Sequence, residues 1–170
     1  YRFCPELHNG AKTLSGTPVR IQLLGQEPNW LAENAVVATD LGSAGIDLNF
    51  GCPAKTVNKN RGGAVLLKDP ESLFNIASAV RKAVPDNQVV TAKMRLGYED
   101  DSLSLENAHA LQDAGVDEIA IHARTKTDGY RPPAYWHQIK KIKQKITTPI
   151  VANGEIWNPS QARQCQEESG

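Results

Sequence analysis

One stretch of this sequence decides the fold predicted for it, Gly45-Ile46-Asp47-Leu48-Asn49-Phe50-Gly51-Cys52-Pro53. Its first half alternates aliphatic with polar residues, which predicts a short strand that begins after a glycine. Gly51 then allows a sharp bend or a close approach to a ligand, and Pro53 prevents the strand from continuing. We therefore expect the thiol of Cys52 at the carboxyl-terminal tip of a strand, where parallel barrels have their active sites.

Outward from this stretch, strand-like and helix-like segments alternate along the chain. The sequence predicts strands at 18–25, 45–49, 89–96, 118–122 and 149–152, and helices at 28–41, 69–84, 104–114, 136–146 and from 158 onward. Residues 1–17 are expected to be irregular, and residues 50–68 form a connection long enough to suggest a functional loop. Strands that alternate with helices favour the α/β class with a parallel sheet, and polar residues at the strand ends favour a barrel.

Composition and charge restrict the class of protein. The chain has 170 residues, of which 40% are apolar and 22% charged, and this fits one soluble globular domain. Its three cysteines are widely spaced, unlike a disulfide framework or a zinc site, so we expect a reducing cytoplasm and no metal. No apolar run reaches the roughly 18 residues of a membrane span, and no membrane contact is expected. Nineteen basic residues balance nineteen acidic ones, so a nucleic acid would have to bind local patches.

Two cations, Lys93 and Arg95, lie within the strand predicted at 89–96. Buried cations are costly unless they are paired or bind an anion. A salt bridge to an acid on a neighbouring strand, such as Asp47 or Glu118, is one interpretation. The other is a contact with a ligand that gains negative charge, which a fixed cation stabilises.

Other polar residues at predicted strand ends have both a structural and a functional interpretation. Cys52 could be a buried apolar residue or an acid, because a protonated thiol needs no neighbouring base to donate its proton. His122 could be a hydrogen-bonded structural group or part of a site, with Arg124 beside it in support. Gln22 could be a satisfied buried amide or a contact to a heterocycle edge, because an amide both donates and accepts hydrogen bonds.

Two loops that follow predicted strands add further candidates. Asn153-Gly154-Glu155 could be a simple turn or a phosphate site made of backbone N–H groups, which the glycine would allow to approach closely. Tyr130 and Arg131, with Lys126 before them, could be a solvated loop tip. They could equally stack on a flipped base and contact phosphate.

Five blocks of this sequence, taken in order, resemble the tRNA-dihydrouridine synthase family of flavoenzymes. The blocks are Val19–Gly25 (VRIQLLG), Asp47–Pro53 (DLNFGCP), Lys93–Gly97 (KMRLG), His122–Thr125 (HART) and Ala152–Glu155 (ANGE). The resemblance implies FMN as cofactor, NADPH as reductant, and reduction of the C5–C6 double bond of a uridine in the D-loop of tRNA. The run from Arg124 to Arg131 most resembles the bacterial branch that acts on uridine 16.

The resemblance also implies roles for single residues. Cys52 would be the general acid that protonates C5 of uracil, and Asn49 would lie against the target base. Lys93 would contact the flavin ring near N1 and O2. The complete flavin-binding set would be Gln22, Lys93, His122, Asn153, Gly154 and Glu155, while Tyr130 would contact tRNA, and Arg95 and Arg124 would support the site.

Matched to the family, the predicted strands correspond to about strands 3 to 7 of a (β/α)8 TIM barrel. We therefore expect residues 1–170 to be part of an FMN-binding catalytic domain. The first strands, strand 8 and a C-terminal helical tRNA-binding domain would be missing, and the full-length enzyme is expected to be a cytoplasmic monomer. Two alternatives stay open. One is an FMN barrel oxidoreductase acting on a small pyrimidine, of the dihydroorotate dehydrogenase kind, and the other is a non-catalytic RNA-binding remnant.

Overall fold

A computed structural model describes residues 4–170 and contains one five-stranded parallel sheet. The strands are β1 (Ile21–Leu23), β2 (Ile46–Phe50), β3 (Val90–Gly97), β4 (Glu118–Thr125) and β5 (Ile150–Asn153). They lie in the sheet in chain order, β1-β2-β3-β4-β5, and every neighbouring pair is parallel. Sequential parallel order is the arrangement of consecutive β/α units in a (β/α)8 barrel, so the predicted fold class is confirmed.

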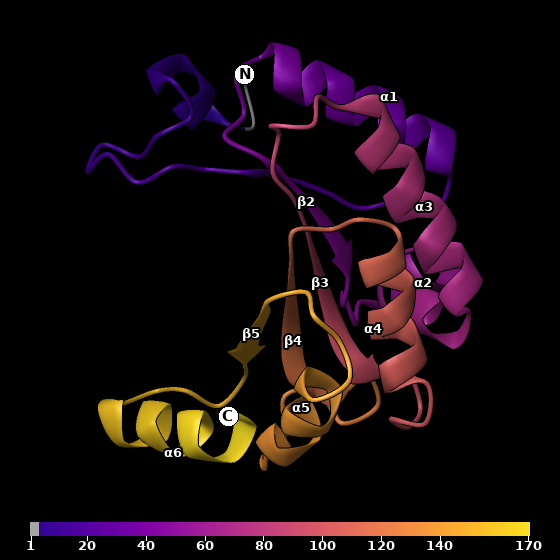
Figure 1. Cartoon of the computed structure of the whole chain (residues 1–170), viewed down its shortest axis with the longest axis vertical. Helices are drawn as coiled ribbons and strands as arrows, with labels where there is room; N and C mark the ends of the chain where they lie inside the picture. Colours follow the sequence, from indigo (N-terminus) through magenta and orange to yellow (C-terminus); the bar gives the residue numbers. More distant parts are fainter. Residues whose placement is uncertain (1–3) are drawn as a thin grey trace.

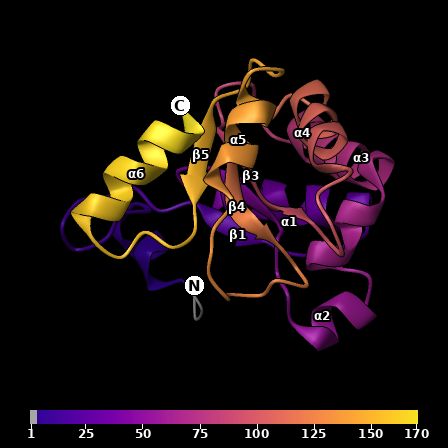
Figure 2. The ribbon, with the colours of Figure 1, turned by 90° about the horizontal axis from the view of Figure 1, so that it is seen from below.

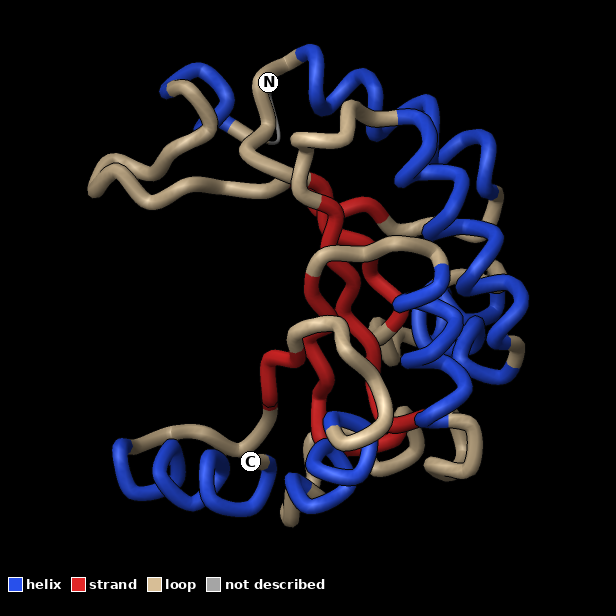
Figure 3. Tube along the Cα trace, viewed as in Figure 1, coloured by secondary structure: helices blue, strands red, loops and turns tan. Residues whose placement is uncertain are grey.

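The helices that connect the strands lie on one side of the sheet (Figures 1 and 3). They are α1 (Pro28–Asp40), α3 (Pro70–Ala83), α4 (Ser104–Asp113) and α5 (Trp136–Lys143), and α6 (Pro159–Ser169) follows β5. Figure 2 shows α6 beyond β5 at one edge of the sheet. Proline occupies the first turn of α1, α3 and α6, where a helix needs no N–H donor. Within residues 4–170, no helix has the length and apolar character needed to cross a membrane.

The two faces of the sheet differ because side chains alternate along each strand. The face covered by helices is apolar, and on β2 and β3 it consists of Ile46, Leu48, Phe50, Val90, Ala92, Met94 and Leu96, each at most 1% exposed. The residues between them are polar or charged, including Asp47, Asn49, Lys93 and Arg95. Burying one large aliphatic side chain stabilises the folded state by about 1.5–3 kcal/mol relative to leaving it exposed. Because a slip of one residue would turn the charged row into this core, the apolar face fixes the register.

Some predicted boundaries were wrong in detail. The strand expected at 18–25 forms only as Ile21–Leu23, since the residues before it pair with the N-terminal segment, where Val19 N–H donates to Ala11 O at 2.8 Å. The connection 50–68 is not an open loop, because it contains α2 (Lys55–Lys59) and the 3-10 helix η2 (Gly63–Lys68). β4 continues to Thr125, where it still pairs with β3, so its end lies beyond the predicted residue 122.

The N-terminal segment agrees with the expectation of an irregular entry. Its single helical turn is the 3-10 helix η1 (Pro5–Asn9), which ends at Gly10 with a left-handed φ of 64°. The part of the expectation that concerns residues 1–3 lies outside the described residues.

Candidate active site

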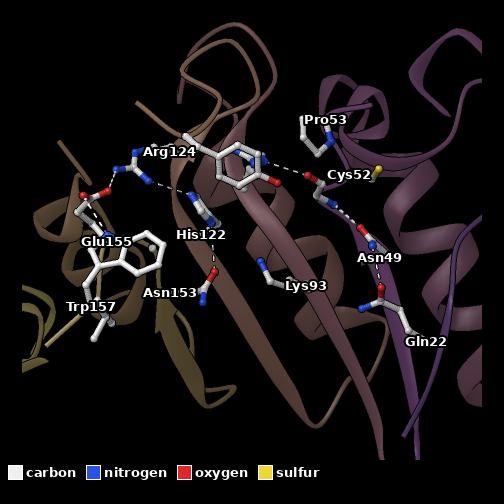
Figure 4. Close-up of a pocket in the computed structure, with 15 residues that line it drawn as sticks. Gln22, Asn49, Cys52, Pro53, Lys93, His122, Arg124, Asn153, Glu155 and Trp157 are labelled. Carbon is white, nitrogen blue, oxygen red and sulfur yellow. Dashed lines mark hydrogen bonds and ion pairs between the residues drawn. The ribbon is translucent and has the colours of Figure 1, made fainter. Parts of the chain in front are cut away.

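A cavity of about 590 Å³ opens at the carboxyl-terminal ends of the strands. Its lining residues are Gln22, Asn49, Gly51, Cys52, Pro53, Lys93, Arg95, His122, Arg124, Tyr130, Asn153, Gly154, Glu155, Ile156 and Trp157. Every residue to which the family resemblance gives a role is among them, whereas the further candidates Lys126 and Arg131 are not. In Figure 4, Cys52, Asn49 and Gln22 lie on one side, Glu155 lies on the other, and Lys93 lies between them. The structure thus brings the predicted residues together, while their individual roles stay predictions.

Lys93 extends from β3 toward the cavity and forms no salt bridge or hydrogen bond with any residue in 4–170. Burial lowers the pKa of Lys93, the charge of Arg95 lowers it further, and Asp47 raises it. The interpretation of Lys93 as one half of a salt bridge is wrong, because Glu118 pairs with Arg20 at 3.5 Å and Asp47 accepts hydrogen bonds from other side chains. The ammonium group is therefore available to a ligand.

Arg95 is only 2% exposed, and it binds backbone carbonyls rather than an acid. Its Nε donates to Gly51 O at 2.9 Å, and its Nη1 donates to Thr125 O at 3.0 Å and Gly129 O at 2.8 Å. The guanidinium carbon lies 5.0 Å from the ring centroid of Tyr130, a cation–π distance. Burial lowers the pKa of Arg95, and Tyr130 opposes that effect. One side chain thereby joins the Gly51 turn to the loop that contains Tyr130.

Both ring nitrogens of His122 are occupied by neighbouring side chains. Nε2 lies 3.4 Å from Nη1 of Arg124, and Nδ1 lies 3.1 Å from Oδ1 of Asn153. Because a guanidinium can only donate, Nε2 accepts, and Nδ1 has the proton that it donates to Asn153. Burial, followed by the charges of Arg95 and Lys93, lowers the pKa of His122 to about 4. His122 is therefore neutral at neutral pH and is suited to orienting its neighbours rather than to proton transfer.

The turn after β5 is fixed by Arg124, which is 2% exposed and forms an ion pair with Glu155. Glu155 also accepts from Nε1 of Trp157 at 3.2 Å, and the hydrogen bond from Arg124 lowers the pKa of Glu155. Gly154 has a φ of 107°, and a Cβ there would lie 3.2 Å from Nε2 of His122, so a larger residue would strain the backbone and press on the imidazole. The carboxylate of Glu155 is occupied, so an anionic ligand would meet the backbone of this turn.

The turn that contains Cys52 is fixed by the connection that follows it. Cys52 O accepts from Asn58 Nδ2 at 2.9 Å and from Ala64 N–H at 3.1 Å. Asn58 also donates to Ala54 O at 2.8 Å, while its own buried Oδ1 has no partner among the described residues. Gly63 has a φ of 66°, and a Cβ there would lie 2.9 Å from the Cβ of Cys52. The long connection therefore positions the thiol-bearing turn by direct packing.

Two residues that line the cavity, Ile156 and Trp157, were not predicted from the sequence, and neither was Asn58 beside it. Trp157 lines the cavity and is 78% exposed, and Asn58 anchors the turn of Cys52. An exposed tryptophan two residues after a predicted phosphate loop was the available signal for Trp157. Asn58 had no local signal, because its burial depends on η2 folding back over it.

The fold and the cavity define a β/α-barrel protein whose ligand site, lined by cations, amides and a thiol, lies at its strand ends. In the part of the chain that the structure describes, no group of three or more His, Cys, Asp or Glu residues could hold a metal ion. The chain belongs to the dihydrouridine synthase family, because the family described as "Dihydrouridine synthase (Dus)" matches residues 3–170. The predicted family is thereby confirmed.

Curated relatives are similar to essentially the whole chain. It is 57% identical over 99% of its length to the tRNA-dihydrouridine(16) synthase of Shewanella oneidensis. The proteins of the same name from Pseudomonas syringae pv. tomato and Vibrio cholerae are 57% and 51% identical over 100% of the chain. The chain spans about half the length of these relatives, 54%, 54% and 53% respectively.

Among the solved structures similar to this chain, one shares the fold at low sequence identity. It is that of phosphonopyruvate hydrolase in complex with oxalate and Mg²⁺, with a TM-score of 0.62 at 16% identity. The similarity covers 96% of this chain and 56% of the other.

Proposed function

We propose that this chain is part of the FMN-binding barrel of a tRNA-dihydrouridine synthase, which reduces the C5–C6 double bond of uridine 16 in the D-loop of tRNA. Family membership and relatives named tRNA-dihydrouridine(16) synthase support this reaction. The observation on which the proposal rests is one cavity that joins Cys52, Lys93 and His122 from three neighbouring β/α units. Residues 1–170 would then supply about strands 3 to 7, and the other strands and the helical tRNA-binding domain would belong to a longer protein.

The cavity residues fit FMN. The volume of about 590 Å³ lies within the roughly 300–1,000 Å³ of small-molecule sites. Lys93 offers its ammonium to a ring edge that gains negative charge on reduction, and Gln22 offers an amide to the same heterocycle. The Asn153–Glu155 turn offers backbone N–H groups to a phosphate, with His122 packed against it. When bound, reduced FMN would supply a hydride to C6 of uracil, and NADPH would restore the reduced cofactor.

The chain's own residues would act on the pyrimidine. The Sγ–H of Cys52 donates its proton to C5 of uracil, and the thiolate recovers a proton from water. Asn49 hydrogen-bonds the edge of the base, and Tyr130, which is 69% exposed, offers a ring on which a flipped base can stack. Arg95 and Arg124 make no direct contribution to the reaction and instead fix the turns on either side.

tRNA is the proposed partner because a uridine in folded tRNA can leave its stack and enter the mouth of the cavity. The Tyr130 loop supports this, since its exposed aromatic ring can stack on a base and Lys126 adds a positive charge at the start of the loop. Free, widely spaced cysteines support a cytoplasmic location. A monomeric full-length enzyme rests on the family resemblance.

The decisive experiment compares Cys52→Ala with wild type in the full-length protein. We expect dihydrouridine at position 16, measured by mass spectrometry of the tRNA, to form at least about 100-fold more slowly while FMN absorbance is retained. Cys165→Ala, a buried thiol outside the cavity, is the matched control and should behave as wild type. A wild-type protein that cannot be reconstituted with FMN would favour the RNA-binding remnant, and equal turnover of dihydroorotate would favour the small-pyrimidine alternative.

A further inference from the structure

Asp47 stands at the end of a chain of hydrogen bonds that crosses β1 and β2. Its Oδ1 accepts from Thr91 Oγ1 at 2.7 Å, and its Oδ2 accepts from Gln22 Nε2 at 2.6 Å. Gln22 Oε1 accepts from Asn49 Nδ2 at 2.9 Å, and Asn49 Oδ1 accepts from the backbone N–H of Gly51 at 3.0 Å. Three residues that line the cavity, Gln22, Asn49 and Gly51, are thereby joined to one carboxylate, which Thr91 of β3 also binds.

The chemistry at the two ends fixes the direction of the whole chain. An ionised carboxylate can only accept, so Gln22 presents its amino group to Asp47 and its oxygen to Asn49. A backbone N–H can only donate, so Asn49 presents its oxygen to Gly51 and its amino group to Gln22. Both ends require the same orientation of both amides. Reversing the amides would place donor against donor at Gly51 and acceptor against acceptor at Asp47.

We propose that Asp47 is a positioning residue that holds the Asn49 amide in the orientation that accepts uracil and rejects cytosine. This inference rests on the proposed function. After its internal bonds, Asn49 retains one N–H on Nδ2 and one lone pair on Oδ1. That pair complements a base edge on which a carbonyl oxygen lies beside a ring N–H, as O4 and N3–H do in uracil. Cytosine has an amino group beside an unprotonated ring nitrogen, so each contact would become repulsive.

The charge of Asp47 is the stronger of the two constraints on the amides. Hydrogen bonds to an ionised acceptor are roughly twice as strong as those between neutral groups. Asp47→Asn removes that charge without changing the size of the side chain, and an amide at this position can either accept from Gln22 or donate to it. Only the Gly51 N–H then opposes reversal of Asn49, so the preference of the site for uracil over cytosine weakens.

The test uses the full-length protein and two tRNAs that are identical except for uridine or cytidine at position 16. The dissociation constant of each is measured by fluorescence anisotropy. Wild type should prefer the uridine form by at least about tenfold, as expected for a two-point base contact. In Asp47→Asn this ratio should fall to about two or less. Glu118→Gln removes a carboxylate that pairs with Arg20 outside the cavity, and its ratio should match wild type.

An unchanged ratio in Asp47→Asn would overturn the role of Asp47, including the case in which both tRNAs bind equally more weakly, as a merely structural role would cause. If Asp47→Asn does not fold, as shown by the lack of a cooperative thermal transition, Gln22→Met is tested in its place. This variant interrupts the same chain of hydrogen bonds and must give the same loss of preference for the uridine form. Asp47 also raises the pKa of Lys93, and a change acting through Lys93 would alter the flavin potential without altering the base preference. Wild type that forms no dihydrouridine would overturn the proposed function as well, whereas normal catalysis with an unchanged ratio overturns only the role of Asp47.

Discussion

Arg95 donates a hydrogen bond from Nε to the backbone carbonyl of Gly51 at 2.9 Å, so β3 directly fixes the bend at the end of β2. The same guanidinium binds two carbonyls at the end of β4 and in the loop that follows, at Thr125 and Gly129. The planar fork of arginine reaches all three from two separate nitrogens, Nε and Nη1, whereas a lysine has a single nitrogen from which to donate. The thiol-bearing turn and the Tyr130 loop are therefore mechanically connected through one buried side chain.

Replacing Arg95 should lower both stability and kcat, whereas replacing a second carbonyl-binding arginine outside the cavity should lower stability alone. Arg95→Lys keeps the charge, but its one nitrogen cannot replace donors at both Nε and Nη1, so we expect the free energy of unfolding to fall by about 1–3 kcal/mol and kcat to fall about tenfold. Arg81 also binds backbone carbonyls, of Pro85 and Gln88, but lies outside the cavity. Arg81→Lys should lower the thermal midpoint without lowering kcat. Equal kcat values in the two variants would contradict the connection.

Removing the charge of Lys93 should make bound flavin harder to reduce. In Lys93→Met we expect the two-electron midpoint potential to fall by about 30–60 mV, because about 1.4–2.8 kcal/mol of stabilisation of the reduced ring is lost. Spectroelectrochemical titration measures this shift. Lys68→Met is the matched control, since Lys68 pairs with Glu99 at 3.1 Å outside the cavity. A potential that is unchanged in Lys93→Met would remove Lys93 from the flavin site.

Acid should destabilise the protein through His122. Its pKa is lowered from 6.5 to about 4 in the folded state, so between these values the unfolded chain takes up a proton that the native imidazole refuses. Native stability is therefore lost as the pH falls from about 6.5 toward 4, by at most about 3 kcal/mol. His122→Gln should show a shallower fall of the thermal midpoint across this window. His137→Gln, at an exposed position, should follow wild type, and parallel curves for all three proteins would contradict the prediction.

Asn58 should control the reactivity of the Cys52 thiol. Asn58→Ala leaves the carbonyls of Cys52 and Ala54 without their side-chain donor, and we expect a loss of about 1–2 kcal/mol in stability. The freed turn should also react several-fold faster with iodoacetamide at Cys52, read by peptide mass spectrometry. Asn107 offers a close match, because it is buried, donates to Leu67 O at 2.9 Å and has an unpartnered Oδ1 among the described residues. Faster alkylation in Asn107→Ala as well would point to general loosening of the connection.

Alternation along the strands made much of this architecture predictable from sequence. Ile46 and Leu48 indicated the buried face of β2, so Asp47 and Asn49 had to face the other way, as they do. Residues that follow strand ends in a parallel sheet converge, which is why Lys93 and the other predicted residues line one cavity.

The partners of these residues were less predictable, because they depend on strand register and on the backbone. The sequence suggested Asp47 only as the acid of an ion pair. In the structure, the register of β1 on β2 places Gln22 opposite Asp47, and the neutral amide of Gln22 donates a hydrogen bond to the carboxylate. Arg95 was expected near an acid or in a supporting role, but it binds carbonyl groups that no side-chain pattern records. Of the short helices in the long connection, η2 packs against β2 and β3, and α2 packs against η2, and these tertiary contacts are not visible in the local sequence.

The strands lie in the sheet in the order in which they are synthesised. The side of the cavity near β2 and the side near β5 are therefore completed at different times during translation. The side with Cys52 and Asn49 can form once β3 has emerged and Arg95 has reached Gly51. The opposite side, with Arg124 bound to Glu155, has to wait until β5 has been synthesised. A nascent chain stalled between these points would hold its thiol in place beside an unfinished binding site.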